Sequence, residues 1–283
     1  MLKQRAIRCA LWAQLCAFVI PLASYAQNAD NLPDWAPQPK PRIIEDRFRV
    51  EVSLLGASFD TQLRIDPVVG LPGTLISAED DLALDDSQIL VAGELTLLPG
   101  EHHLVRLSGL SARRSAQTTL ERRIVFDDEV YFANERVDSE LNLTLFGLTY
   151  GYRFVANDRA ELTATFGIQV AEVEANAVVR SRVVRDAESG VAPLPLLGIE
   201  GRFDFTPQWG VEARIQYLKA NIEDVDGSIM DLRASLTWRT NSHLSFGLGY
   251  RSFAIDIDSA NESTPGLVDM KIAGPMLSMR ASL

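Results

Sequence analysis

Hydrophobic and polar residues alternate with a period of two along most of the chain. In two adjacent arms of the chain the alternate positions are Leu232, Ala234, Leu236 and Trp238, and then Leu244, Phe246, Leu248 and Tyr250. The residues between them are mostly Ser, Thr, Gly and Arg, and Thr240, Asn241 and Ser242 separate the arms. This pattern predicts a β-hairpin with one apolar face. The apolar face would be inside a soluble sheet but outside, against lipid, in an outer-membrane barrel.

The same alternation predicts about ten strands, most near the length of about 9–11 residues that crosses a bilayer as a tilted strand. The predicted strands are 47–59, 88–98, 103–113, 139–154, 160–174, 195–205, 209–222, 232–239, 244–251 and 273–283. We therefore predict an all-β fold, a closed antiparallel up-and-down transmembrane β-barrel with about ten strands, in a range of about eight to twelve.

The predicted connections alternate between long and short, as in outer-membrane barrels with short periplasmic turns and longer outer loops. A connection of moderate length falls around Asp224 to Gly227. The long connections are 67–87, 114–137, 176–192 and 258–268, and the short ones are 99–101, 156–158, 206–208 and 240–242.

In a barrel, the polar face of each strand would line the lumen, and its charges are of both signs. We expect them to pair there, because an unpaired buried charge is costly. The predicted lumen charges are Arg49, Glu51, Glu94, Arg106, Glu140, Glu161, Glu200, Arg202, Glu212, Arg214, Asp231, Arg233, Arg251 and Arg280.

The chain is divided into three predicted parts. Residues 1–26 have a basic start, an apolar stretch and small residues before the predicted cut after Ala26, which is typical of a signal peptide. Residues 27–45 are rich in proline and are predicted to be a periplasmic linker, and 46–283 the barrel. Cys9 and Cys16 both lie in the signal, so the mature chain has no disulfide or thiol chemistry. The formal net charge of −11 argues against a nucleic-acid partner.

Two segments carry a resemblance to known proteins. The C-terminal "GPMLSMRASL" (274–283) resembles the last strand of small Gram-negative outer-membrane β-barrels, in which the final residue is usually aromatic and is here Leu283. The segment "GTLISAEDDLALDDS" (73–87) resembles a stretch in proteobacterial outer-membrane barrels of undefined function. The resemblance implies location in the outer membrane, contact with its lipid and lipopolysaccharide, and insertion by the barrel-assembly machinery. It also implies a monomer.

The sequence contains no recognisable catalytic site. Enzymatic barrels such as omptin-like proteases and lipid A deacylases rely on a histidine, but His102, His103 and His243 fall in or beside short turns at the predicted periplasmic end. Phosphate-binding loops and zinc-binding spacings are absent from the sequence. The sequence therefore predicts no enzyme and no cofactor.

Acidic loops are the remaining candidate for chemistry. The five carboxylates of the first long loop are a weak candidate for Ca²⁺ or Mg²⁺, because such cations take oxygen ligands. A solvated acidic loop is the favoured explanation for them. The residues are Glu79, Asp80, Asp81, Asp85 and Asp86, and further acids occur at Asp127, Asp128, Glu129, Asp224 and Asp226.

Three functions fit these observations. The first is a non-enzymatic outer-membrane barrel with a mostly side-chain-filled lumen, in a structural or surface-binding role through its acidic loops. The second is a narrow channel whose lumen charges set selectivity for ions or small solutes. The third is a soluble periplasmic β-barrel that binds a ligand.

Overall fold

The computed structural model describes residues 47–66, 73–126, 129–179, 184–222, 225–259 and 266–283. The predicted signal peptide (1–26) and linker (27–45) lie outside the described residues, and both stay predictions. Within the described ranges the chain forms no helix that is long and apolar enough to cross a membrane.

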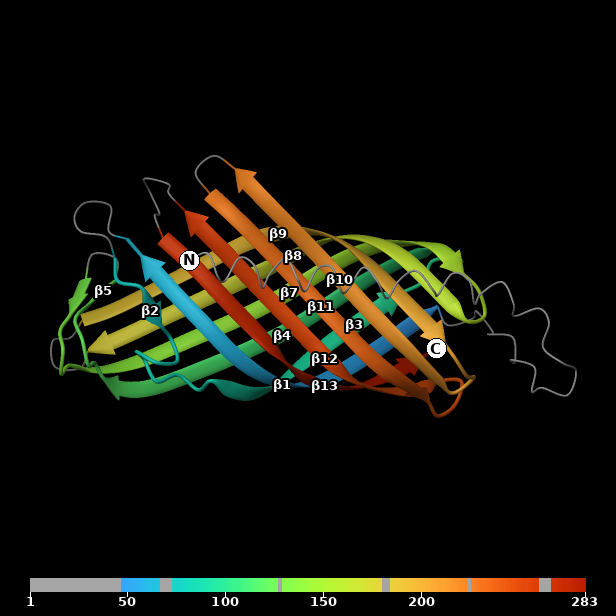
Figure 1. Ribbon diagram of the computed structural model, residues 1–283, viewed down its shortest axis with the longest axis horizontal. Helices are drawn as coiled ribbons and strands as arrows, with labels where there is room; N and C mark the ends of the chain where they lie inside the picture. Colours follow the sequence, from blue (N-terminus) through green and yellow to red (C-terminus); the bar gives the residue numbers. More distant parts are fainter. Residues whose placement is uncertain (1–46, 67–72, 127–128, 180–183, 223–224, 260–265) are drawn as a thin grey trace, which may run out of the picture.

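Ten long strands of the described chain form one closed antiparallel barrel, and the prediction of this fold is confirmed (Figure 1). Each strand pairs with the next long strand in sequence, and β1 pairs with β13 to close the wall. The barrel strands are β1 (Phe48–Ile65), β3 (Ser87–Leu97), β4 (His103–Thr119), β7 (Arg136–Ala156), β8 (Ala160–Val179), β9 (Val184–Asp204), β10 (Trp209–Ile222), β11 (Val225–Arg239), β12 (Leu244–Ser259) and β13 (Gly266–Ser282). The short strands are β2 (Ile76–Ser77), β5 (Ile124–Phe126) and β6 (Glu129–Tyr131).

The two ends of the barrel differ. Tight connections, which include 98–102 and 157–159, gather at one end together with the C-terminal residue Leu283, and we call it the short-turn end. At the opposite end, the long-loop end, lie β2 and the β5–β6 hairpin (Figure 1). The segment 73–86, which contains β2, is called the mouth loop.

The predicted long connection at 176–192 is wrong. There β8 and β9 continue as a paired hairpin, from Ala171 opposite Ala192 to Val179 opposite Val184. This stretch is rich in valine, and β-branched residues favour extended strands even where no alternation marks them.

The strands reverse their inside–outside pattern about halfway along. In β7, Leu141, Leu143 and Leu145 face the lumen near the long-loop end, each at most 6% exposed. From Phe146 onward the apolar side chains face outward, and Phe146 is 62% exposed. At 21 residues, β7 is about twice as long as a membrane-spanning strand needs to be. The wall therefore has an apolar outer surface only in its short-turn half.

The seam between β1 and β13 is unusually close at the same level. Pairing is regular from Arg49 opposite Ser282 to Leu55 opposite Met276, and resumes at Ser58 opposite Ala273. Between these points a Cβ atom on Gly274 would lie 1.8 Å from the carbonyl oxygen of Gly56.

Candidate functional site

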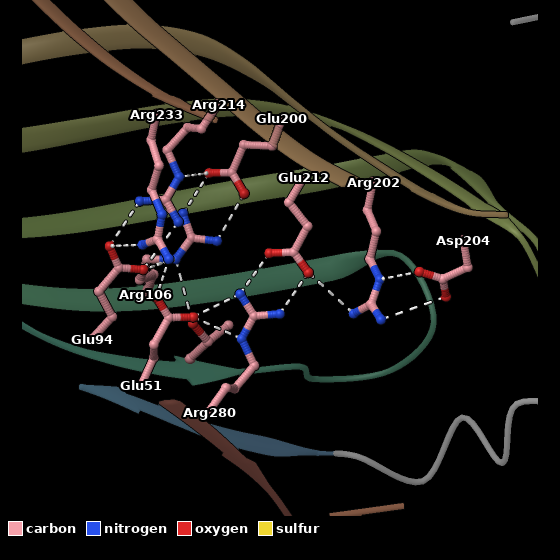
Figure 2. Close-up of polar contacts among 11 residues, drawn as sticks. Glu51, Glu94, Arg106, Glu200, Arg202, Asp204, Glu212, Arg214, Arg233 and Arg280 are labelled. Atoms are coloured by element: carbon pink, nitrogen blue, oxygen red, sulfur yellow. Dashed lines mark hydrogen bonds and ion pairs between the residues drawn. The ribbon is translucent and has the colours of Figure 1, made fainter. Parts of the chain in front are cut away.

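Buried charged side chains fill the short-turn half of the lumen (Figure 2). They come from strands all around the wall, and we call them the lumen ion-pair network. The predicted lumen charges that line cavities there are Arg49, Glu51, Glu94, Arg106, Glu161, Glu200, Arg202, Glu212, Arg214, Asp231, Arg233, Arg251 and Arg280.

Glu94 is the acceptor for three arginines. Arg214 Nη1 and Nη2 donate to its two carboxylate oxygens at 2.9 and 3.0 Å. Arg233 Nη1 lies 3.3 Å from Glu94 Oε1, and Arg106 Nε lies 3.5 Å from Oε2. Arg106 also donates to both oxygens of Glu200. Together these contacts link β3, β4, β9, β10 and β11 across the lumen.

A second chain of ion pairs runs toward the short-turn end. Arg280 donates from Nη1 and Nη2 to the two oxygens of Glu212, both at 2.6 Å, and from Nε to Glu51 Oε2 at 2.8 Å. Arg202 Nη1 lies 3.3 Å from Glu212 Oε1, and its Nε lies 3.0 Å from Asp204 Oδ1. Figure 2 shows this chain from Glu51 to Asp204.

Two further pairs extend the network. Arg251 binds Asp231 through Nε and Nη2 at 3.1 and 2.8 Å. Arg153 donates from Nη2 to the carbonyl of Gly100 at 3.1 Å, and its Nη1 lies 3.9 Å from Glu161 Oε1.

The charged side chains of the network are shielded from water, so their pairing affects the stability of the barrel. Glu51, Arg106 and Arg233 are 5, 6 and 7% exposed. Charges removed from water carry a desolvation penalty of several kcal/mol each, which charge-assisted bidentate bonds offset. A cavity of about 70 Å³ remains among these charges, which is room for a few water molecules.

Glu140 was predicted to line the lumen but lies on the outer surface. It belongs to the long-loop half of β7, where the pattern has reversed and the leucines face inward. Its side chain is 41% exposed and lies 3.9 Å from Arg113, whose side chain is 78% exposed.

Above the network, in the long-loop half, an apolar layer fills the lumen. Its members come from β1, β3, β4, β7, β8, β9, β11, β12 and β13, so it spans the bore. The buried residues of this apolar layer are Leu55, Ala57, Phe59, Leu90, Ala92, Leu110, Ala112, Leu143, Leu145, Ala171, Leu196, Ile229, Phe253, Ile255, Met270, Ile272 and Met276.

The mouth loop lies over the apolar layer and is fixed by Arg114, which is 3% exposed. Its guanidinium pairs with Glu79 and donates to Thr61 Oγ1 at 3.0 Å. It also lies 4.2 Å from the ring centre of Phe59, a cation–π contact. Glu79 in turn accepts a bond from the Thr61 amide at 2.9 Å. One of the five acids considered as metal ligands therefore serves as an ion-pair partner.

Asp81 fixes the other side of the mouth loop. Its two oxygens accept bonds from Arg122 Nε and Nη2 at 2.9 and 2.7 Å, and the Ser77 amide donates to Oδ2 at 2.9 Å. The hydrogen bonds from Arg122 hold the pKa of the Asp81 carboxyl below its ordinary value, and the same contact raises the pKa of Arg122.

The structure does not bring the five acids of the mouth loop together. Asp80, Asp85 and Asp86 are exposed, whereas Glu79 and Asp81 face different arginines. Within the described ranges, no three His, Cys, Asp or Glu side chains form a group that could hold a metal ion. Asp127, Asp128 and Asp224 lie outside those ranges.

The three histidines lie at the short-turn end, in or next to turns. His102 Nδ1 lies 3.0 Å from the carbonyl oxygen of Arg153, and His103 Nδ1 lies 2.7 Å from Tyr150 Oη. His243 Nδ1 lies 2.9 Å from Ser242 Oγ. These contacts join each ring to a neighbouring backbone or hydroxyl oxygen.

Sequence reasoning missed four charged residues of these sites, Arg114, Arg122, Arg153 and Asp204, and Arg122 fell within the predicted long connection 114–137. Asp204 follows the same period-two rule as Glu200 and Arg202, so the alternation contained its signal. Arg153 shares the parity of Leu141 and Leu143, and it lies in the lumen with them because β7 changes from apolar to polar on its inner face. Arg114 was missed because the predicted strand stopped at residue 113, whereas β4 continues to Thr119.

Comparisons with known proteins concern the fold alone. Neither a family model nor a curated protein matches the chain. Among solved structures, the outer membrane protease OmpT from Escherichia coli is similar with a TM-score of 0.53 and 9% identity, over 84% of this chain and 97% of that one. The transport unit of the autotransporter AIDA-I from Escherichia coli follows with 0.43 and 9%, over 92 and 98%. Ail from Yersinia pestis gives 0.34 and 10%, over 84 and 99%. The likeness to OmpT shows that the chain shares its barrel fold.

Proposed function

We propose that the protein is a non-enzymatic outer-membrane β-barrel whose lumen is closed to solutes and whose long-loop end acts at the cell surface, in a structural or binding role. The observation that carries this proposal is the filling of the lumen. The apolar layer and the lumen ion-pair network lie one above the other, and each reaches across the barrel. A solute would have to displace both.

The outer surface supports placement in a membrane. In the short-turn half the wall exposes a belt of large apolar side chains, whereas soluble monomers rarely expose apolar patches larger than a few hundred Å². The belt includes Leu107, Phe146, Leu148, Phe166, Ile199, Leu248 and Leu277, each more than half exposed. Next to the short turns Trp209, Trp238 and Phe246 stack at 6.2 and 6.1 Å, as in an interfacial aromatic girdle.

The difference between the two ends of the barrel supports one orientation in the membrane. The short-turn end would face the periplasm, and the long-loop half, whose outer wall is polar, would project toward lipopolysaccharide. Asp80, Asp85 and Asp86 remain exposed there, so they are the acids available to a bridging Ca²⁺ or Mg²⁺. The barrel-assembly machinery would insert the chain through its C-terminal strand β13, as a monomer.

Single cysteines in a chain that starts at residue 27 test this placement, because the two native cysteines lie before it. In lipid vesicles, Leu148→Cys should resist a water-soluble maleimide, while Asn142→Cys, six residues away on the same outer face, should react. In the alternative of a soluble periplasmic ligand binder, the chain would stay in solution without detergent and both cysteines would react equally.

A further inference from the structure

An apolar cavity of about 60 Å³ lies at the long-loop end, apart from the lumen ion-pair network. The mouth loop covers it on one side, the β5–β6 hairpin on another, and the ends of β7 and β8 form its floor. The lining side chains are mostly aliphatic and include Ile76, Leu82, Leu120, Ile124, Tyr131 and Leu141.

The walls of this cavity are preorganised. Two buried clusters meet there, one around Ile76 and Ile124 and one around Ala78 and Leu84. The ion pairs of Arg114 with Glu79 and of Arg122 with Asp81 fix the mouth loop, so the cavity needs little ordering to accept a guest.

One polar group stands out at the floor. Ser139 lines the cavity and is 5% exposed, and its Oγ has no hydrogen-bond partner within the part of the chain that the structure describes. A buried hydroxyl without a partner is costly. Rotation about χ1 moves a serine hydroxyl between staggered positions, so Oγ can turn toward the cavity.

We propose that this cavity is a binding site for a small, uncharged, mostly apolar molecule with one hydroxyl or carbonyl oxygen, which hydrogen bonds to Ser139 Oγ. The volume has room for about four to six non-hydrogen atoms, if each takes about the space of one water-sized probe. The lining is mostly aliphatic, and Ser139 offers one hydrogen bond beside the polar groups of Tyr131, Glu140 and Asn176, which together fit this class of ligand.

The test uses cyclopentanol and methylcyclopentane, which differ only by a hydroxyl in place of a methyl group. The protein is labelled with ¹³C at the isoleucine δ1 methyl groups and titrated in detergent micelles. Ile76 and Ile124 report on the cavity, while Ile168 and Ile199, exposed on the outer belt, report on partition into detergent.

We expect saturable shifts of Ile76 and Ile124 with cyclopentanol, and only linear drift of Ile168 and Ile199. Methylcyclopentane should bind about 5–10-fold more weakly, because it makes no hydrogen bond. Ser139→Ala should weaken cyclopentanol binding by the same factor and leave methylcyclopentane unchanged. Ala175→Leu, which fills the cavity, should abolish saturation, whereas Ala234→Leu on the outer wall should not.

The proposal is overturned if all four isoleucines drift alike, if cyclopentanol has no advantage over methylcyclopentane, or if Ala175→Leu leaves saturable binding intact. The chemical shifts of folded Ala175→Leu without ligand distinguish a filled cavity from a misfolded barrel. None of these results depends on whether the lumen conducts or where the protein resides.

Discussion

Leu145 and Phe146 are consecutive residues of β7 that face opposite surroundings. The side chain of Leu145 is 2% exposed and packs in the apolar layer, whereas that of Phe146 is 62% exposed on the outer wall. On the long-loop side of this pair the wall is polar outside and apolar inside, and on the short-turn side it is the reverse. The pair therefore marks the level where we place the boundary of the membrane.

The first prediction concerns that boundary. Leu148→Arg places a charge on the apolar belt, two residues inside that boundary, and should destabilise the barrel in a lipid bilayer by about 1–2 kcal/mol, between the interfacial and midplane values. Thr144→Arg, four residues away on the same outer face of β7, should cost less than about 1 kcal/mol. Urea unfolding in vesicles measures both. Equal costs would contradict the boundary.

The second prediction concerns the lumen ion-pair network. Glu94→Gln removes the charge that Arg214, Arg233 and Arg106 share, and should destabilise the barrel by about 3–5 kcal/mol because these buried cations lose one of their compensating carboxylates.

Glu140→Gln is the matched control for this substitution. Its exposed pair with Arg113 should contribute less than about 1 kcal/mol. Both free energies of unfolding come from the same urea titration, followed by tryptophan fluorescence. A network without stabilising value would give the two variants the same midpoint.

The third prediction concerns the seam between β1 and β13. Gly274→Ala puts a Cβ atom 1.8 Å from the Gly56 carbonyl oxygen, so the strands must separate, at a cost of about 1–3 kcal/mol or more. Gly93→Ala is the control, because a Cβ there meets no atom within 4 Å. The temperature at which the folded band disappears in heat-modifiable gel migration should fall for the first variant and not for the second.

The fourth prediction concerns pH. Because Arg122 lowers the pKa of Asp81 in the folded protein, the contact contributes its stability above the unfolded value of about 3.9. That contribution is lost as the pH falls through the lower folded value. The pair is partly exposed, so its contribution should be below about 1 kcal/mol.

The Ser77 amide, which donates to Asp81, reports on this titration. Its proton chemical shift should change with a midpoint below pH 3.9, and the transition should disappear in Asp81→Asn. A midpoint at or above the ordinary value would show that Arg122 does not hold the carboxylate in solution.

The strand pattern of the barrel was predictable because its signals are local. Alternation and turn residues such as Pro99–Gly100 or Asn157–Asp158 are written in short stretches, and each acts on the strand next to it. Closure was inferred from the even number of strands together with the alternating connection lengths, the predicted signal peptide and the absence of cysteine beyond it. The hairpin of β8 and β9 was missed because the paired valines Val178–Val179 and Val183–Val184, with charged residues around them, break the alternation.

The reversal of the pattern was not predicted, because each strand was assigned one apolar face throughout its length. The sequence does contain a signal, since Leu54–Leu55 and Leu145–Phe146 are adjacent apolar residues that interrupt the alternation. This error put Glu140 in the lumen. The ion-pair partner of each charge could not be predicted from the sequence either. Arg214 and Glu94, for example, are 120 residues apart and meet only through the register of the closed barrel.

The central claim is that the two layers close the lumen, and conductance across a planar lipid bilayer tests it most directly. Folding is verified by heat-modifiable gel migration and insertion by flotation with lipid vesicles. Folded, inserted protein should produce no current steps above the bare membrane. Discrete, reproducible steps would contradict closure of the lumen. They would support a narrow channel whose selectivity is set by the lumen charges.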